Sequence, residues 1–536
     1  MKSLSAWNPE DTTFWEREGK KIAVRNLLIS IPNLLLAFSI WMLWSMIIVR
    51  IQGLHDNNPA LFNFALWNEH PLMDDAYRAL LYTLPAVAGL SGATTRITNS
   101  FIVAICGGRN VKGITTLLMI LPALGTGIAL QDPQTSFFVF IILAALSGIG
   151  GGAFASSMSN ISFFFPKRMQ GLTLGLNAGL GNLGVAVMQL IVPLVITFGI
   201  FGDEPYLLGN TSVWLGNAGL VWVPILLFFG ILAFMFMNNM EEHHSGNFFR
   251  ALGNYVWLEI IGFGGAFVGI ILLLIPWRGV PELVKIAMIV LASIIVTVIL
   301  LKVCIPQKIK PLVQKQFGIF RDKHNWMMTY LYMMTFGSFI GYSSAFPKLL
   351  KDVFGYIRVD AEGNPLSETI VNPYAPDIFS YVFLGAALGA AIRPIGGWLS
   401  DKYGGARVTH WDTIIMIITT FFVGYSIHEA QSSPHPEDYF LSFLGLFILL
   451  FVTTGIGNGS TFRMIAVIFS KEERGPVLGW TSAVAAFGSF LIPILFAMQI
   501  SQGTPEYAFY GFAAYYVSCL LLNFWFYHRK NAHVHC

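Results

Sequence analysis

Apolar segments of about twenty residues recur along the whole chain, and short polar stretches rich in Pro, Gly, Asp and Asn separate most of them. A helix needs about 20 mostly apolar residues to cross the hydrocarbon core of a bilayer. The pattern therefore predicts an all-α membrane protein with about fourteen transmembrane helices. The expected spans are 25–49, 78–105, 112–130, 136–163, 171–199, 217–239, 254–276, 283–304, 325–346, 376–399, 408–427, 438–468, 475–499 and 505–527.

The composition supports this prediction, because 55% of the 536 residues are hydrophobic and only 11% are charged, against about 25% charged in soluble domains. The net charge of +3 is small and no basic block is present, so we expect the lipid bilayer and no nucleic acid as a partner. The four cysteines form no CxxC pair and no HExxH sequence occurs. The acidic and histidine run at 241–244 and the histidines of 528–536 are expected to be solvated. We therefore expect no enzyme, no metal site and no cofactor.

Positive charge is distributed unevenly over the loops. With the N-terminus inside, cytoplasmic loops hold 22 of the 32 Lys and Arg residues and external loops hold seven. An excess of Lys and Arg marks the cytoplasmic side of a membrane protein. We therefore expect an even number of spans with both termini in the cytoplasm. The three remaining basic residues, Arg96, Arg393 and Arg463, lie inside spans.

Two regions of the chain repeat each other. Arg96 and Arg393 are each followed, eleven residues later, by a Gly-Gly pair. Three glycines of GLTLGLNAGLGNLG, at 171, 175 and 184, recur at the same offsets in GPVLGWTSAVAAFG, at 475, 479 and 488. The repeat predicts two parallel six-helix halves, with the spans 254–276 and 283–304 inserted between them.

This layout is that of the major facilitator superfamily, in which the substrate binds near the midplane between the halves. The segment GGWLSDKYGGARV (396–408) resembles that superfamily's loop motif. We expect an N-terminal six-helix half at 1–245, an inserted transmembrane pair and cytoplasmic linker at 246–320, and a C-terminal six-helix half at 321–536.

The paired arginines are the clearest candidates for chemistry. Arg96 lies about ten residues from the cytoplasmic end of its span, which is roughly 15 Å deep at 1.5 Å per residue. Long arginine side chains can snorkel to the surface, and this remains the alternative reading. Because Arg96 and Arg393 occupy the same repeat position, both are expected to face one central cavity, where an anion between them would relieve their repulsion. For Arg463 the sequence favours neither a cavity-lining nor a snorkelling position.

Acidic residues, in contrast, are scarce within the spans. Glu259, in the inserted pair, is the only one well inside a predicted span. Proton-coupled carriers usually rely on an intramembrane Asp, Glu or His relay, so the sequence offers little to build one.

The apolar segment 171–189 contains five glycines, which make its helix less stable. Each glycine inside a helix costs about 0.5–1 kcal/mol relative to alanine. Steps of four from Gly171 to Gly179 place glycines on one face, where they would allow close helix packing. Gly181 and Gly184 fall with Asn177 on an adjacent face, where an anion or a moving helix could approach. Packing alone would explain the glycines but not Asn177, which needs a polar partner.

Several long stretches resemble the bacterial NarK-type nitrate/nitrite porter family of the major facilitator superfamily. They are WNPEDTTFWEREGKKIAVRNL at the start, FASSMSNISFFFPKRMQG before the glycine-rich segment, TFGSFIGYSSAF at 335–346, AIRPIGGWLSDKYGGARVT, and GIGNGSTFRMIAVIF. The glycine-rich segment is similar to the family's nitrate signature, and 475–488 to its second copy. The antiporters of this pattern have twelve spans, so the inserted pair is a departure.

The resemblance implies a substrate site and a transport mode. It implies that Arg96 and Arg393 clamp the anion, that aromatic side chains line the site, and that Asn177 and the signature glycines contribute polar or close contacts. The residues so implied, besides the arginines, are Asn177, Phe154, Tyr332, Phe336, Phe462, Gly175 and Gly479. The expected activity is nitrate/nitrite exchange by a monomer in the bacterial inner membrane. Proton-coupled nitrate symport is the alternative, and a passive channel is a weaker one.

Overall fold

The computed structural model describes residues 7–64, 74–240, 247–305, 317–470 and 473–532, together with residues 310, 314, 534 and 536. The run at 241–244, the boundary expected at 245/246, and the tail residues His533 and His535 lie outside the described residues. Nearly all described secondary structure is helical, as the apolar pattern predicts. The exceptions are two antiparallel hairpins, β1–β2 and β3–β4.

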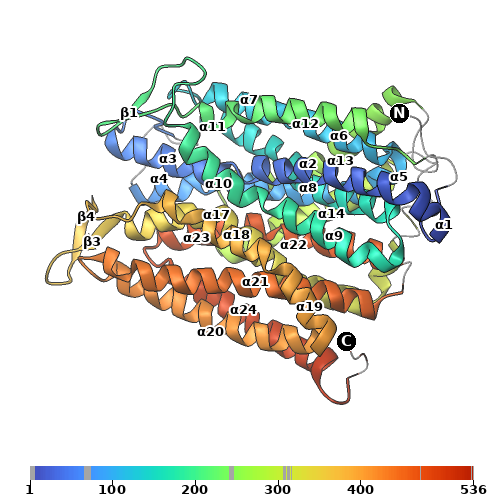
Figure 1. Cartoon of the computed structure of the whole chain (residues 1–536). Helices are drawn as coiled ribbons and strands as arrows, with labels where there is room; N and C mark the ends of the chain where they lie inside the picture. The colour runs from blue at the N-terminus through green and yellow to red at the C-terminus, as the bar shows by residue number, and fades with distance from the viewer. Residues whose placement is uncertain are drawn as a thin grey trace.

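The helices run side by side along one common direction (Figure 1). Both β-hairpins lie at one end of this bundle, here called the hairpin end. Helix α1 and the C-terminus lie at the opposite end, here called the termini end. The elements of the N-terminal part (7–240) are α1 (Thr12–Phe14), η1 (Trp15–Gly19), α2 (Lys20–Trp41), α3 (Trp44–Asn57), α4 (Asp74–Leu81), α5 (Thr83–Cys106), α6 (Gly108–Leu118), α7 (Ile120–Ala129), α8 (Phe137–Phe164), α9 (Lys167–Asn182), α10 (Gly184–Val195), β1 (Tyr206–Leu208), β2 (Thr211–Val213), α11 (Asn217–Leu220) and α12 (Trp222–Phe236).

Two long helices, α13 (Phe248–Leu274) and α14 (Glu282–Val303), follow. The C-terminal part (317–536) then comprises η3 (Phe317–Arg321), α16 (Lys323–Tyr332), η4 (Met333–Gly337), α17 (Ser338–Phe354), β3 (Tyr356–Val359), β4 (Pro365–Val371), η5 (Ile378–Ser380), α18 (Val382–Ala391), α19 (Arg393–Tyr403), α20 (Gly405–Gln431), η6 (Pro436–Tyr439), α21 (Phe440–Ile468), α22 (Arg474–Ala486), α23 (Gly488–Ser501), α24 (Glu506–Asn523) and η7 (Phe524–His528).

Twelve helical segments of the described residues are long and apolar enough to cross a membrane. They cover twelve of the predicted spans. The other two predicted spans, 78–105 and 325–346, coincide with α5 and with α16–α17, which are helical and mostly buried but are not among the twelve. Buried Ser, Thr, Asn and Tyr residues lower the hydropathy of these two segments.

Corresponding glycines end corresponding helices in the two parts of the chain. Gly107 follows α5 with φ 82°, and Gly404 follows α19 with φ 90°. Only glycine adopts this backbone conformation without strain. These are the glycines that follow Arg96 and Arg393 at the same spacing, so the sequence repeat has a structural counterpart.

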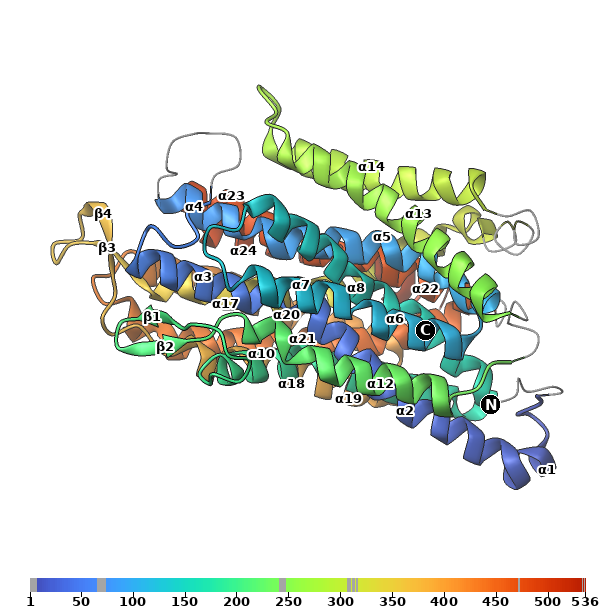
Figure 2. The ribbon, with the colours of Figure 1, turned by 90° about the horizontal axis from the view of Figure 1, so that it is seen from above.

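Helix α5 lies at the centre of the packing, in contact with α8, α22, α23 and α13. At its crossing with α23 a Cβ on Gly89 would lie 2.4 Å from the backbone carbonyl of Ser489, so only glycine permits this approach. The pair α13 and α14 lies at one side of the bundle, with α13 alongside α5 (Figure 2).

At the hairpin end, a network of polar side chains joins the N-terminal and C-terminal parts. Asp352 on α17 accepts hydrogen bonds from Lys348 (Nζ–Oδ1 2.7 Å), from Gln52 on α3 (3.1 Å) and from Tyr82 (3.0 Å). Tyr356 donates to Asp56, which also lies 3.5 Å from the ammonium of Lys351, and Arg78 donates to Thr369 (2.9 Å). The two parts are thus held together at this end.

The close contact between α10 and α2 gives a stability prediction. A Cβ on Gly184 would lie 2.0 Å from the backbone oxygen of Leu35, so Gly184→Ala must force the helices apart. Overpacking of this kind costs about 1–3 kcal/mol. We expect a lower melting temperature for purified Gly184→Ala. The control is Gly511→Ala, since no atom lies within 4 Å of the added Cβ; an equally stable Gly184→Ala variant would contradict the packing.

Candidate functional site

Arg96 projects from the middle of α5 and is completely buried. Its Nε donates to the carbonyl oxygen of Gly151 on α8 at 2.8 Å, and its Nη1 to the carbonyl of Ser482 on α22 at 3.3 Å. Its Nη2 has no hydrogen-bond partner among the described residues. Arg96 therefore links the N-terminal part to the C-terminal part and retains free donor capacity.

Arg393 is the first residue of α19 and is 6% exposed. Pro394 follows it; proline lacks a backbone N–H and is favoured at a helix start, which explains why a new helix begins here after α18. None of the three guanidinium nitrogens of Arg393 has a hydrogen-bond partner within the described part of the chain. Neither arginine snorkels to the surface, since both are buried.

The ring of Phe336 is shared by the two guanidinium groups. The Cζ of Arg96 lies 5.2 Å from the ring centroid, and that of Arg393 lies 5.7 Å from it. Phe336 belongs to η4, a single π-helical turn between α16 and α17. Such turns are frequent at functional sites because they re-aim side chains within a helix. The structure therefore brings together the two arginines that the repeat predicts to face one centre.

The predicted aromatic residues gather around the same ring. Phe154 stacks on Phe336 at 5.9 Å between centroids and also lies 4.9 Å from the Cζ of Arg96. Tyr332 also stacks on Phe336, at 5.5 Å between ring centroids, and the Phe462 ring lies 5.2 Å from that of Tyr332. The hydroxyl of Tyr332 is buried, with no hydrogen-bond partner among the described residues.

Two further aromatic residues complete this cluster, and the sequence reasoning missed both. The Trp41 ring lies 5.0 Å from the Cζ of Arg96, and the Phe339 ring lies 4.3 Å from that of Arg393. Phe339 follows Phe336 by three residues and so shares its helix face, which is a signal that the sequence contained.

Stacking of this kind leaves the most useful part of a guanidinium available. Aromatic rings attract the cation over their faces, whereas the N–H groups of arginine point outward in its plane and form a fork that matches an oxyanion. No described carboxylate forms an ion pair with Arg96 or Arg393. A buried charge without such a partner is costly, so the site is suited to a small anion held by donors from both parts of the chain.

Asn177 lies near this cluster but is held by other groups. Its Nδ2 donates to Ser157 Oγ at 3.0 Å and lies 3.6 Å from the sulfur of Met158, one turn beyond Phe154 on α8. Its side-chain oxygen has no partner among the described residues. Asn177 thus has the polar partner that its apolar setting requires, and a contact with substrate stays a prediction.

The structure contradicts the expected packing positions of the signature glycines. Close packing was expected at Gly175 and Gly179, yet a Cβ on Gly175 would meet nothing within 4 Å, and one on Gly179 only a carbonyl at 3.9 Å. Close packing occurs instead at Gly181 and Gly184, where α2 approaches to 2.6 Å and 2.0 Å of the added Cβ. The face assignment was wrong because residue spacing defines faces of a helix but not which neighbour each face meets.

In the second copy of the segment, Gly479 of α22 faces α5. A Cβ there would lie 3.1 Å from Ser100 Oγ, so the glycine allows a close approach between the N-terminal and C-terminal parts. Ser100 lies one turn from Arg96 on α5.

Arg463 does not join the cluster. Its Nε lies 2.6 Å from Asp401 Oδ1, and the two side chains are 41% and 67% exposed. Of the two positions that the sequence left open for Arg463, the structure places it in a surface ion pair with the end of α19.

The expectation that Glu259 is the only acidic side chain well inside a span was wrong. Asp412 is buried within α20, and its Oδ2 has no hydrogen-bond partner among the described residues. Asp352 and Glu506 are buried in α17 and α24. Asp352 and Glu506 lie close to the ends of their helices, whereas Asp412 lies about two turns after the start of α20, and neighbouring helices cover all three.

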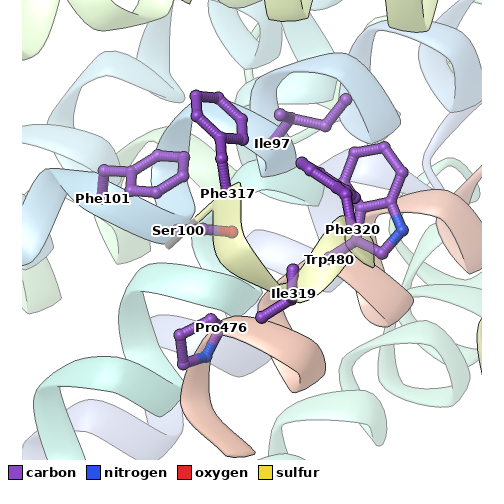
Figure 3. A pocket seen from close by; sticks show the side chains of 8 residues that line it. All are labelled: Ile97, Ser100, Phe101, Phe317, Ile319, Phe320, Pro476 and Trp480. Carbon is purple, nitrogen blue, oxygen red and sulfur yellow. The ribbon is translucent and has the colours of Figure 1, made fainter. Parts of the chain in front are cut away.

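An apolar pocket has neither Arg96 nor Arg393 in its lining, although Ile97, the neighbour of Arg96, contributes to it (Figure 3). Ile97, Ser100 and Phe101 of α5 line one side, and Pro476 and Trp480 of α22 line another. The remaining wall is η3, whose Phe320 packs against Trp480 at 4.6 Å between centroids. With Ser100 Oγ as its one side-chain oxygen in Figure 3, this pocket offers little to hold an anion.

Comparisons with known proteins give a consistent result. A model of the Major Facilitator Superfamily matches residues 378–535. The chain is 33% identical to the probable nitrate/nitrite antiporter NarK2 of Thermus thermophilus, over 99% of this chain and 98% of that protein. It is 34% identical to the nitrate/nitrite transporter NarU of Escherichia coli, over 98% of this chain and 96% of that protein.

Solved structures show the same fold at low sequence identity. The chain resembles a D-xylose-proton symporter with a TM-score of 0.58 and 13% identity, over 94% of this chain and 97% of that one. It also resembles a bacterial homologue of the human drug peptide transporters, with a TM-score of 0.55 and 12% identity, over 94% and 97% of the two chains.

The lack of partners for Arg393 leads to a stability prediction. We expect Arg393→Gln to raise the melting temperature of the purified, anion-free protein, because it removes a buried charge whose burial costs about 1–3 kcal/mol. Arg463→Gln is the control and should change stability by about 0.5 kcal/mol or less, because exposed ion pairs contribute little. A lower melting temperature for Arg393→Gln would mean that the guanidinium is satisfied without an anion.

Proposed function

The chain belongs to the NarK/NarU-type nitrate/nitrite transporter family of the major facilitator superfamily, and we propose that it exchanges nitrate for nitrite across a bacterial inner membrane. It is a transporter and not an enzyme. We propose that Arg96 and Arg393 hold the anion between them. The observation that carries this proposal is the pair of buried guanidinium groups around Phe336, with unused donors on both.

The chemistry of the proposed site fits nitrate and nitrite. Both are small, planar monoanions with oxygen acceptors in the plane. The N–H groups of two arginines can donate to these oxygens in that plane, while the faces of Phe154, Phe336 and Tyr332 restrict the thickness of the site. A tetrahedral anion such as sulfate would meet the rings, which favours planar substrates.

We place the hairpin end on the periplasmic side and both termini in the cytoplasm. The sequence supports this orientation, because the loops predicted to be cytoplasmic hold 22 of the 32 Lys and Arg residues. We further propose fourteen crossings, in which α5 and α16–α17 join the twelve apolar segments. Both lie among these segments in the bundle and carry the polar groups of the site, which explains their lower hydropathy.

In the proposed cycle, residues 1–245 and 321–536 act as two halves that rock about the anion. The network around Asp352 would close the periplasmic side in the described state and would separate when that side opens. The close contact of Gly479 with Ser100, and the bond from Arg96 to Ser482, would change in the same step. One chain contributes both arginines, so a monomer suffices.

Exchange follows from the charge of the site. An empty carrier would have to bring two uncompensated guanidinium groups together in a desolvated centre, which is unfavourable. A bound anion removes part of this cost, so reorientation is favoured when nitrate or nitrite is present. Obligatory one-for-one exchange is the consequence.

Proton-coupled nitrate symport is the second candidate, and Asp412 is the observation that favours it. This buried carboxyl has an unpartnered oxygen, which a Cβ on Gly457 would approach to 2.9 Å. The same Cβ would lie 2.5 Å from Thr335, the neighbour of Phe336. Protonation of Asp412 could thus influence the turn that carries Phe336.

The role of the arginines is tested by charge-preserving substitutions. We expect Arg96→Lys and Arg393→Lys to reduce kcat/KM for nitrate uptake into proteoliposomes about 100-fold or more, because lysine keeps the charge but loses the planar fork. Arg463→Lys is the matched control, since Arg463 lies outside the cluster. Near-normal uptake by both of the first two variants would contradict an anion clamp.

The transport mode is tested by the contents of the vesicle. External nitrate should enter nitrite-loaded proteoliposomes rapidly and empty ones at least about tenfold more slowly, with no effect of an imposed pH gradient. Uptake into empty vesicles that is driven by external acid would establish symport instead. In that case Asp412→Asn should abolish the pH dependence.

A further inference from the structure

The inserted helix α13 packs directly against the turn of α5 that bears Arg96. A Cβ on Gly262 would lie 2.8 Å from the Cα of Thr95, and one on Gly269 would lie 2.7 Å from Leu90. Glycines thus bring α13 into backbone contact with α5. Glycines of the same helix also hold the inserted pair together: a Cβ on Gly265 would lie 1.9 Å from Thr297 Oγ1, and one on Gly264 would lie 2.8 Å from Leu300, both on α14. Gly269 serves both contacts, since its Cβ would also lie 2.2 Å from Ser293 Oγ of α14.

Beside this contact, a buried hydrogen bond joins the inserted pair to α5. Glu259 of α13 is 5% exposed, and its Oε1 accepts from Asn99 Nδ2 at 2.6 Å. The same Nδ2 donates to the carbonyl of Thr95 at 3.0 Å, within α5. Asn99 is therefore fixed both to its own helix and to α13.

Asn99 also contacts α8, the helix that accepts a hydrogen bond from Arg96. A Cβ on Gly152 of α8 would lie 2.8 Å from Asn99 Nδ2, so the side chain is wedged between α8 and Glu259. The preceding residue, Gly151, accepts the hydrogen bond from Arg96 Nε. The position of Asn99 therefore sets how α5 lies against α8, and with it the direction of the Arg96 guanidinium.

The described residues of the second half show no equivalent of this arrangement. In the repeat, Gly396 corresponds to Asn99, since it follows Arg393 by three residues. A Cβ on Gly396 would lie 2.4 Å from the backbone oxygen of Ile456, so α19 and α21 pack directly on each other there. The larger side chain of Asn99 needs a partner that direct helix packing does not supply.

A carboxyl group inside a membrane protein is costly and is usually retained for a function. We infer that Glu259 is a positioning residue for the anion site, which holds Asn99 against α8 and thereby aims Arg96 at the substrate. The inserted pair is then a working part of the first half and moves with it. The inference rests on the proposed role of Arg96.

The test measures nitrate uptake in proteoliposomes containing the full chain with Glu259→Leu or Glu259→Gln. Glu259→Leu should raise KM about tenfold, the effect of one charge-assisted hydrogen bond. Glu259→Gln should stay within about twofold of wild type, because the glutamine oxygen still accepts from Asn99. Glu282→Leu is the matched control, since Glu282 lies exposed at the start of α14 in the same pair.

A double variant separates positioning from packing. Asn99→Ala combined with Glu259→Leu should raise KM no further than Glu259→Leu alone, because both remove one interaction. A lower melting temperature of Glu259→Leu with an unchanged KM for nitrate would overturn the inference. Equal changes in KM for Glu259→Leu and Glu259→Gln would also overturn it. If Arg96→Lys transports normally, the proposed function fails; if only the Glu259 variants do, this inference alone fails.

Discussion

Two guanidinium groups are buried in the centre of this protein beside a shared phenylalanine ring, and no carboxylate of the described residues pairs with them. Much of the surrounding structure follows from that unfavourable arrangement. The glycine contacts of α5 bring Arg96 to the centre, the proline after Arg393 starts α19 there, and a π-helical turn aims Phe336 between them. Rings around the arginines lower the cost of burying the charge but leave the N–H groups free. In the proposed function, a small anion supplies the negative charge that this site lacks.

The polar network at the hairpin end has the opposite electrostatic arrangement. There the charges are paired: Lys348 with Asp352, Lys351 with Asp56, and Arg78 with Asp75. Of these pairs only Lys351–Asp56 joins the two parts of the chain, beside the hydrogen bonds that Gln52 and Tyr82 donate to Asp352. The other two pairs lie within one part and neutralise the charges there. In the proposed cycle the two regions have different roles. The central guanidinium groups need a bound anion to offset their charge, whereas the groups at the hairpin end pair with one another when that end is closed.

The sequence predicted the features that recur along the chain, namely the apolar helical segments and the paired arginines. Apolar periodicity located all fourteen expected helical segments, and the repeat of Arg96 and Arg393 predicted that they would face each other. What could not be predicted depends on which neighbour a helix face meets. Gly175 and Gly184 are equally plausible packing residues in the sequence, but only Gly184 meets another helix closely. Trp41 joins the site from a distant segment, and Asp412 is buried by neighbouring helices that local composition does not reveal.

The central claim is that one nitrate ion is held by both arginines at the same time. A structure of the protein determined with bound nitrate tests it most directly. The account predicts a planar density between the guanidinium groups of Arg96 and Arg393, within hydrogen-bonding distance of both and beside the ring of Phe336. Density at the pocket of Trp480, at the Arg463–Asp401 pair, or on only one of the two arginines would contradict it.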